Sequence, residues 1–324
     1  MSEMTAVVDE LREGRRFVLC THEHPDGDAL GSLAAMQLAL TQLGKDVVSF
    51  MAAEELPLGY EYRFLTMDGL ATEVPEVDGR TVVYLDCGNI DRNSFRADGA
   101  LILNIDHHHD NTRFGTVNHV VPDASSTAEV VWTLLEPLGV RLTREIAEAL
   151  YVGLVTDTGK FMYENTGPGA HRMAAALLEA GIDAQGIYRQ LYEGIPAAKL
   201  DLLSRGLANM ERYDGGTLSL SYLPKADYDA AGAEEAYSEG VVDHLRALEG
   251  TIVAALVRDQ LGAGREGSRK VSLRASDDRV DVSAIAREWG GGGHRRAAGF
   301  TTAAELPELV GFLRRSIAAQ LAPA

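Results

Sequence analysis

Acidic and imidazole side chains gather just after three apolar runs in the first half of the chain. The runs are RRFVLC, TVVYL and ALILNI, and the residues that follow them are His22, Asp26, Asp28, Asp86, Asp106, His107 and His108. One such residue is usually a turn or a helix cap, and Asp28 taken alone fits a cap of the following helix equally well. Three run ends that each supply a carboxylate, two of them with imidazoles, instead indicate one shared site.

A fourth carboxylate, Asp157, ends the apolar helical run YVGLVTD. An acid at a helix C-terminus is unfavourable because of the helix dipole, and clustered carboxylates raise one another's pKa. A pair of divalent cations would resolve both conflicts. Oxygen and neutral imidazole ligands without thiolate favour Mn²⁺, with Mg²⁺, Co²⁺ and Fe²⁺ left open. Two such ions about 3.5–4 Å apart can activate water for displacement at phosphorus, so these residues predict a phosphoester hydrolase.

A second signal lies near the C-terminus, in SAIAREWGGGGHRRAAGF. Consecutive glycines let backbone N–H groups converge on an anion, so we expect Gly291, Gly292, Gly293 and His294 to form a phosphate-binding loop. Arg274, in VSLRAS, could add a bidentate phosphate contact, although taken alone it reads as a surface arginine on a strand. These residues are the expected substrate-binding set.

The elements that must position these residues follow an alternating pattern of strands and helices. Apolar runs separated by helical stretches predict an α/β fold with a parallel sheet in the N-terminal domain. The chain reads as mostly helical from Ser125, and strands return after Tyr213. We therefore expect a metal-binding domain at 1–195, a linker helix at 196–213, and a smaller α/β substrate domain at 214–324.

Composition narrows the functional classes. The 324 residues carry a net charge of −18, which argues against binding long duplex DNA. Residues 246–315 hold 12 Lys and Arg against 9 Asp and Glu, so the C-terminal part is comparatively basic and suits a small anionic ligand. The two cysteines are too few for a disulfide framework, which is typical of a protein in the reducing cytosol. No apolar run approaches a membrane span, so we expect a cytoplasmic protein without a membrane partner.

In order and spacing, these motifs resemble the DHH/DHHA1 phosphoesterase family, and most closely its short bacterial oligoribonucleases, or nanoRNases, that also act as pAp phosphatases. The segments that carry the resemblance are HEHPDGDALGS, LDCGN, IDHHHDN, SSTAEVV, GLVTDTGKF and DVSAIAREWGGGGHRRAAGF. DHH alone is a weak signal, but the ordered set spans nearly the whole chain. The resemblance implies a DHH domain joined by a linker helix to a DHHA1 domain.

The resemblance also implies a role for each residue. His22 and Asp26 would bind one metal ion. Asp28, His107 and Asp157 would bind the other, and Asp86 would bridge both. His108 would contact the scissile phosphate or protonate the leaving group, and Asp106 would orient an imidazole. Arg274, His294 and the glycines would hold a phosphate or the terminal nucleotide.

The implied activity is manganese-dependent hydrolysis of short single-stranded RNA to mononucleotides, together with removal of the 3′-phosphate of pAp. Turnover of cyclic di-AMP or pApA is the nearest alternative, because it would use the same centre. A RecJ-like exonuclease fits less well, since the chain is acidic and lacks further nucleic-acid-binding domains. If the protein were a non-catalytic nucleotide sensor, at least one metal-binding residue of the family pattern should have been replaced, and all of them are present. A homodimer is left open.

Overall fold

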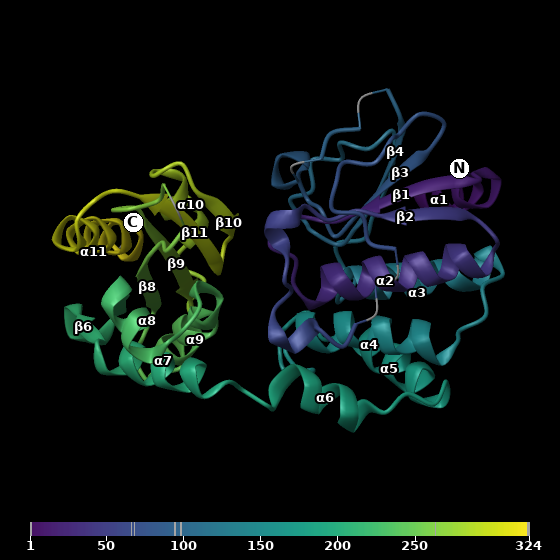
Figure 1. Cartoon of the computed structure of the whole chain (residues 1–324). Coiled ribbons are helices and arrows are strands. Elements are labelled where there is room, and N and C mark those ends of the chain that lie inside the picture. The colour runs from purple at the N-terminus through teal and green to yellow at the C-terminus, as the bar shows by residue number, and fades with distance from the viewer. Residues whose placement is uncertain are drawn as a thin grey trace. The chain divides into compact units, whose positions relative to one another are not determined.

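Two separate sheets organise the chain (Figure 1). The computed structural model describes residues 2–65, 67, 69–93, 95–97, 99–262 and 264–322, and it leaves the side chain of His294 undescribed. The chain divides into two compact units, Met1–Gly194 and Ile195–Ala324. Each unit is built around its own sheet.

The first unit has a five-stranded, all-parallel sheet in the order β2-β1-β3-β4-β5. Its strands are β1 (Arg16–Cys20), β2 (Asp46–Ser49), β3 (Thr81–Leu85), β4 (Leu101–Asp106) and β5 (Val117–Val120). Its helices are α1 (Glu3–Glu13), α2 (Gly27–Gln42), α3 (Thr127–Leu138), α4 (Arg144–Asp157), α5 (Pro168–Glu179) and α6 (Ala184–Tyr192). The parallel α/β fold predicted from the alternating pattern is confirmed.

Successive side chains of a strand point to opposite faces of the sheet, so they contribute to two different hydrophobic cores. On β1, Phe17 and Leu19 join the larger core beneath the helices, whereas Val18 and Cys20 join a smaller core on the opposite face. Helix α2 is buried along most of its length, because α4 packs on its side away from the sheet and α3 lies beside it (Figure 1). The core therefore fixes both the sheet and the layered helices against each other.

Two helical glycines bring α2 and α4 unusually close. A Cβ added at Gly31 of α2 would lie 2.5 Å from the backbone oxygen of Ala149 on α4, and one added at Gly153 of α4 would lie 2.7 Å from Asp28 Oδ1 on α2. These distances are shorter than real Cβ contacts, so neither position has room for a side chain. The close packing brings the end of α4, with Asp157, beside the start of α2, with Asp28.

The strand order reverses between β1 and β3, since the chain moves outward to β2 and then returns across β1 to β3. Ligands in open α/β sheets bind at such a reversal, outside the carboxyl ends of the strands. The histidine and acidic segments follow β1, β3 and β4, and these are the neighbouring strands at that point. The topology therefore places the expected site where this fold class places its ligands.

The second unit has a six-stranded mixed sheet in the order β10-β11-β9-β8-β7-β6, in which only the β7–β8 pair is parallel. Its strands are β6 (Glu211–Tyr213), β7 (Leu218–Leu223), β8 (Val253–Asp259), β9 (Arg269–Ala275), β10 (Gly292–His294) and β11 (Ala297–Thr302). Its helices are α7 (Ala197–Ala208), α8 (Lys225–Ala231), α9 (Val241–Arg246), α10 (Val282–Arg287) and α11 (Leu306–Leu321).

The helix expected over 196–213 is shorter than predicted. It ends at Ala208, and Glu211–Tyr213 form β6, because their backbone pairs with β7. Leu202 of α7 is fully buried among Leu223, Tyr228 and Leu245 of the second unit. Helix α7 is thus packed into the second unit along one face. None of the helices in the described part of the chain combines the length and the hydropathy that crossing a membrane requires.

Candidate metal centre

The first group of potential ligands lies at the ends of β1 and β3. His22, Asp26 and Asp86 each offer a ligand atom, and these atoms lie within 4.8 Å of one another. His22 is 6% exposed, and its Nδ1 is 2.8 Å from the backbone oxygen of Glu23. An N–H donated to that carbonyl leaves Nε2 available as a ligand atom, and Nε2 lies 3.6 Å from Asp86 Oδ2.

Asp26, and not Asp28, caps helix α2. Asp26 Oδ1 accepts hydrogen bonds from the backbone N–H groups of Asp28 and Ala29, at 3.0 and 3.1 Å. The cap interpretation of Asp28 is therefore wrong, because the helix begins at Gly27, two residues earlier than that interpretation requires. Asp28 is left for a different set of contacts.

The second group consists of Asp28, His107 and Asp157, whose ligand atoms also lie within 4.8 Å of one another. His107 Nε2 is 3.6 Å from Asp157 Oδ2 and 3.9 Å from Asp28 Oδ2. Asp28 is 1% exposed, and its two oxygens accept the backbone N–H groups of Thr127 and Ala128 at 2.6 and 2.9 Å. The N-terminus of α3 thus holds this carboxylate in place.

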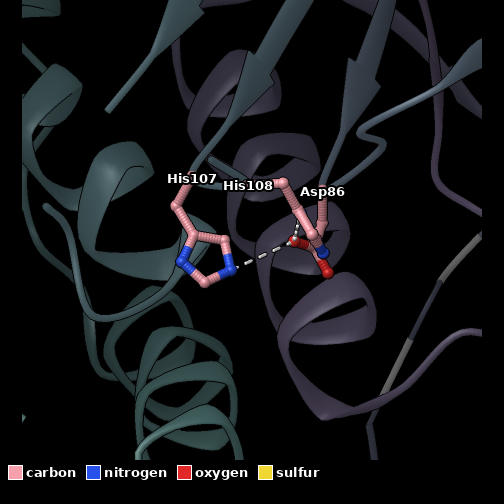
Figure 2. A group of neighbouring side chains, drawn as sticks. All are labelled: Asp86, His107 and His108. Carbon is pink, nitrogen blue, oxygen red and sulfur yellow. Dashed lines mark ion pairs between the residues drawn. The ribbon is translucent and has the colours of Figure 1, made fainter. Parts of the chain in front are cut away.

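Asp86 lies between the two groups. Its Oδ2 faces His22, while its Oδ1 lies 3.8 Å from His107 Nε2. Figure 2 shows His107 and His108 approaching this carboxylate from the neighbouring strand end. The backbone of Asp86 has φ +56°, a left-handed conformation that is costly for a non-glycine residue and typical of functional sites. The arrangement suits a carboxylate that contacts two cations.

His108 and Asp106 form a hydrogen-bonded pair beside Asp86. His108 Nδ1 is 2.8 Å from Asp106 Oδ1 and 3.6 Å from Asp86 Oδ1. Asp106 is fully buried and also accepts the backbone N–H of His107 at 2.8 Å. One acid therefore fixes both the main chain of His107 and the ring of His108. Ligand atoms of Asp86, His107 and His108 also lie within 4.8 Å of one another, so His108 is close enough to be a ligand.

Without cations, two of the acids hold protons more tightly than usual. Burial raises the pKa of Asp28 well above its ordinary value, and the charges of Asp86, Asp157 and Asp26 raise it further. Burial is also the main reason that the pKa of Asp157 rises to about 7. The charge of His107 opposes this rise, whereas those of Asp86 and Asp26 add to it. The metal-free site thus avoids having all its carboxylates ionised together.

The histidines supply the compensating charge. Burial would raise the pKa of Asp86, but the neighbouring imidazoles outweigh it and the pKa falls below the ordinary value. Burial opposes a charge on His108, yet the hydrogen bond to Asp106 and the charge of Asp86 raise its pKa to about 9. Divalent cations could take the place of these protons, leaving neutral imidazoles and ionised carboxylates as ligands. The donor set therefore fits a pair of hard or borderline metal ions.

Two residues that the sequence motifs did not single out, Thr127 and Asn165, support the potential ligands. The hydroxyl of Thr127 donates to Asp86 Oδ1 at 2.8 Å, and the amide of Asn165 donates to Asp157 Oδ2 at 3.2 Å. Thr127 belongs to the SSTAEVV segment, where two serines and a threonine open a helix. That motif could have indicated a helix N-terminus near the acids, but nothing in its spacing identified its partners.

In the second unit, Arg274 lies on β9 with its side chain 31% exposed. Its Nε is 3.5 Å from Asp243 Oδ1, and one of its terminal nitrogens donates to the backbone oxygen of Leu273 at 3.1 Å. The side chain of His294 is outside the described part of the chain, although its backbone ends β10. A substrate contact by either residue stays a prediction.

The glycine segment is not the loop that we expected. Gly292 and Gly293 belong to β10, which pairs with β11 in an antiparallel ladder. A Cβ at Gly291 would lie 2.2 Å from the backbone oxygen of Gly299, and Gly293 has φ +134°. These glycines therefore meet a demand for close strand packing, and a phosphate contact by their backbone stays a prediction.

Comparison with family models agrees with this division into two units. The model described as DHH family, N-terminal domain, matches residues 16–154, which include all but one of the proposed ligands. The model described as DHHA1 domain matches residues 221–319, within the second unit.

Individual relatives match over most of the chain. The bifunctional oligoribonuclease and PAP phosphatase NrnA of Thermus thermophilus is 36% identical over 303 residues, covering 92% of this chain and 88% of the relative. An exopolyphosphatase-related protein from Bacteroides fragilis has a TM-score of 0.87 at 24% identity, covering 98% and 96% of the two chains. RecJ of Thermus thermophilus in complex with Mn²⁺ has a TM-score of 0.55 at 17% identity, covering 98% of this chain and 54% of RecJ. The last two likenesses concern the fold.

Proposed function

The chain belongs to the DHH/DHHA1 family of phosphoesterases, and we propose from this that it hydrolyses short oligoribonucleotides to mononucleotides and removes the 3′-phosphate of pAp. The observation that carries the proposal is the pair of potential metal groups that meet at Asp86. A relative named for these two activities aligns over 92% of the chain, which supports the choice of substrate.

The proposed ligands are His22, Asp26 and Asp86 for one ion, and Asp28, His107 and Asp157, again with Asp86, for the other. When bound, two divalent ions supply an activated water and neutralise charge at the phosphorus. We propose Mn²⁺, in keeping with the mixed donor set and with the manganese named for RecJ. Asp106 would keep the ring of His108 oriented, and His108 would pass a proton to the leaving oxygen.

Substrate length would be set outside the metal centre. The centre can act on any phosphoester, whereas a short nucleotide needs contacts beyond the scissile bond to be distinguished. We assign those contacts to the second unit, through Arg274, His294 and the backbone of Gly291, Gly292 and Gly293. A cytoplasmic location and a homodimer stay predictions.

A product assay with a substrate panel tests this function. The purified protein is treated with chelator, restored with Mn²⁺, and incubated with pAp, a trinucleotide RNA, pApA, cyclic di-AMP and long single-stranded DNA. We expect AMP from pAp and mononucleotides from the RNA. An Asp86→Asn variant is the inactive control, and an Asp183→Asn variant, altered at the N-cap of α6, controls for loss of an acid elsewhere in the same unit.

The panel also separates the alternatives. Faster turnover of cyclic di-AMP or pApA than of pAp and RNA would favour a phosphodiesterase that acts on these dinucleotides. Processive degradation of the DNA would favour a RecJ-like exonuclease. No turnover by a protein that holds two ions would favour a nucleotide sensor, and the proposed function would then be wrong.

A further inference from the structure

Arg92 is an exposed cation next to the metal centre, and the site as described gives it no role. It ends the 3-10 turn η3 (Ile90–Arg92), six residues after Asp86. Its guanidinium has no hydrogen bond or ion pair with any residue that the structure describes. In an acidic unit whose arginines commonly pair with carboxylates, such a cation is available for a ligand.

The segment that carries Arg92 is attached to both metal-binding strand ends. On the β1 side, the backbone N–H of Glu23, next to His22, donates to the backbone oxygen of Arg92 at 2.7 Å. On the β4 side, the backbone N–H of Thr112, four residues after His108, donates to the backbone oxygen of Gly88 at 2.8 Å. Arg92 is therefore presented by a segment that packs between the two histidine-bearing loops.

The neighbouring arginine on the same segment is used differently. Arg96 donates to the backbone oxygens of Ile90 and Phe95, at 2.9 and 3.2 Å, and lies 3.3 Å from Asp91. Buried Asn93 adds a hydrogen bond to the backbone oxygen of Thr21 and accepts the backbone N–H of Phe95. Arg96 and Asn93 thus hold the segment in shape, so Arg92 is not needed for that purpose.

The guanidinium acts electrostatically on the site itself. Burial lowers the pKa of His22 and of His108, and the neighbouring acids raise it. The charge of Arg92 has a smaller effect and lowers the pKa of both. Burial raises the pKa of Cys87 to about 12, and the charge of Arg92 opposes that rise. The geometry agrees with this, since Arg92 follows Asp86 by six residues and its backbone oxygen is bonded beside His22, so the residue belongs to the same edge of the sheet as the proposed ligands.

We propose that Arg92 contacts the substrate, with its guanidinium binding a non-bridging oxygen of the phosphate group that the metal centre holds. The inference rests on the proposed phosphoesterase function and adds a phosphate contact supplied by the first unit. Arginine suits the role because its planar fork can donate two parallel N–H bonds to one phosphate. The bond would strengthen as negative charge builds up on the equatorial oxygens, so it would favour the transition state.

The test compares Arg92→Ala and Arg92→Lys with Arg15→Ala. Arg15 is also an exposed arginine of the first unit, but it precedes β1 and so lies at the opposite end of the strand from the site. Each Mn²⁺-loaded protein is assayed for kcat/KM on pAp and trinucleotide RNA, for AMP affinity by calorimetry, and for metal content. We expect Arg92→Ala to lower kcat/KM by about 10- to 100-fold with two ions retained, and Arg92→Lys to fall between it and wild type.

The controls keep this inference separate from the proposed function. If wild type turns over the substrates while Arg92→Ala matches Arg15→Ala in both kcat/KM and AMP affinity, the inference alone is wrong. Loss of metal from Arg92→Ala would also overturn it, since the residue would then support the ligands. If wild type turns over no substrate yet AMP binding weakens only in the Arg92 variants, the phosphate contact stands and the proposed function fails.

Discussion

Replacing Asp157 with asparagine is expected to stabilise the metal-free protein above neutral pH while weakening its affinity for metal. Asp157 is the last residue of α4, and burial is the largest cause of its raised pKa of about 7. Asparagine has nearly the same shape and keeps an oxygen that can accept the hydrogen bond from Asn165. The substitution therefore removes the charge with little change in packing.

The expected gain in the free energy of unfolding follows from the linkage between protonation and folding. The pKa of Asp157 rises from 3.8 to about 7, and at 1.36 kcal/mol per unit this corresponds to about 4 kcal/mol. The side chain is 27% exposed, so water screens part of the effect, and we expect about 2 kcal/mol. This stability is fully present below pH about 4, where Asp157 is protonated in both states, and is lost by pH about 7. The advantage of Asp157→Asn should therefore grow as pH rises through that window.

Urea unfolding of chelator-treated protein at several pH values from about 5 to 8.5 measures the difference. Glu179→Gln is the matched control, because Glu179 is also the last residue of its helix, α5, but is exposed to solvent. We expect the control to show no comparable pH-dependent gain. A metal-free Asp157→Asn protein that is less stable than wild type at the highest pH would refute the reasoning, as would a gain that is independent of pH.

Adding Mn²⁺ should reverse the order of stability. A metal concentration 100 times the dissociation constant stabilises a protein by about 2.7 kcal/mol, provided that the unfolded chain does not bind. Wild type should gain more than Asp157→Asn at the same Mn²⁺ concentration, since the variant has lost a charged ligand. Equal gains would remove Asp157 from the ligand set, whatever its effect on the metal-free protein.

Three further predictions concern hydrolysis. Asp86→Ala should abolish turnover of every substrate, because its two oxygens face the two ligand groups; near-normal activity after chelation and Mn²⁺ restoration would mean that the bridge is misassigned. His108→Ala should lower kcat while leaving metal content largely intact, whereas loss of half the manganese would make His108 a ligand. Arg274→Ala and His294→Ala should each cost about 1.5–3 kcal/mol in kcat/KM on short oligonucleotides and much less on bis(p-nitrophenyl) phosphate. Equal losses on both substrates would exclude their anchoring role.

The parts of the site that the sequence predicts are those that depend on strand ends. Apolar runs identify buried strands, and in a parallel sheet the residues that follow adjacent strands must meet at one edge. This is why His22, Asp86 and His107 could be expected to converge although 85 residues separate the first from the last. Their burial and their distances then follow from β1, β3 and β4 being neighbours.

The parts that the sequence does not predict depend on backbone groups and on close approach. Asp28 is held by N–H groups about 100 residues away, and a backbone donor leaves no signature in residue type. The glycine segment suggested an anion-binding loop, yet Gly291 is required by the approach of Gly299 on β11. Glycine runs serve either purpose, and only the strand pairing distinguishes them.

The N-terminus of α3 explains how such a dense group of acids is held in one geometry. Its first residue, Thr127, is fully buried, and it gives its backbone N–H to Asp28 and its hydroxyl to Asp86. One helix end therefore positions a carboxylate from each side of the site, with the positive end of the helix dipole favouring their ionised forms. Burial and neighbouring acids still keep the pKa of Asp28 high, so the helix fixes the position of the carboxylate without fully compensating its charge. The positive charge that is still lacking would come from a cation. The positions in which α3 holds the acids are those at which they could share one.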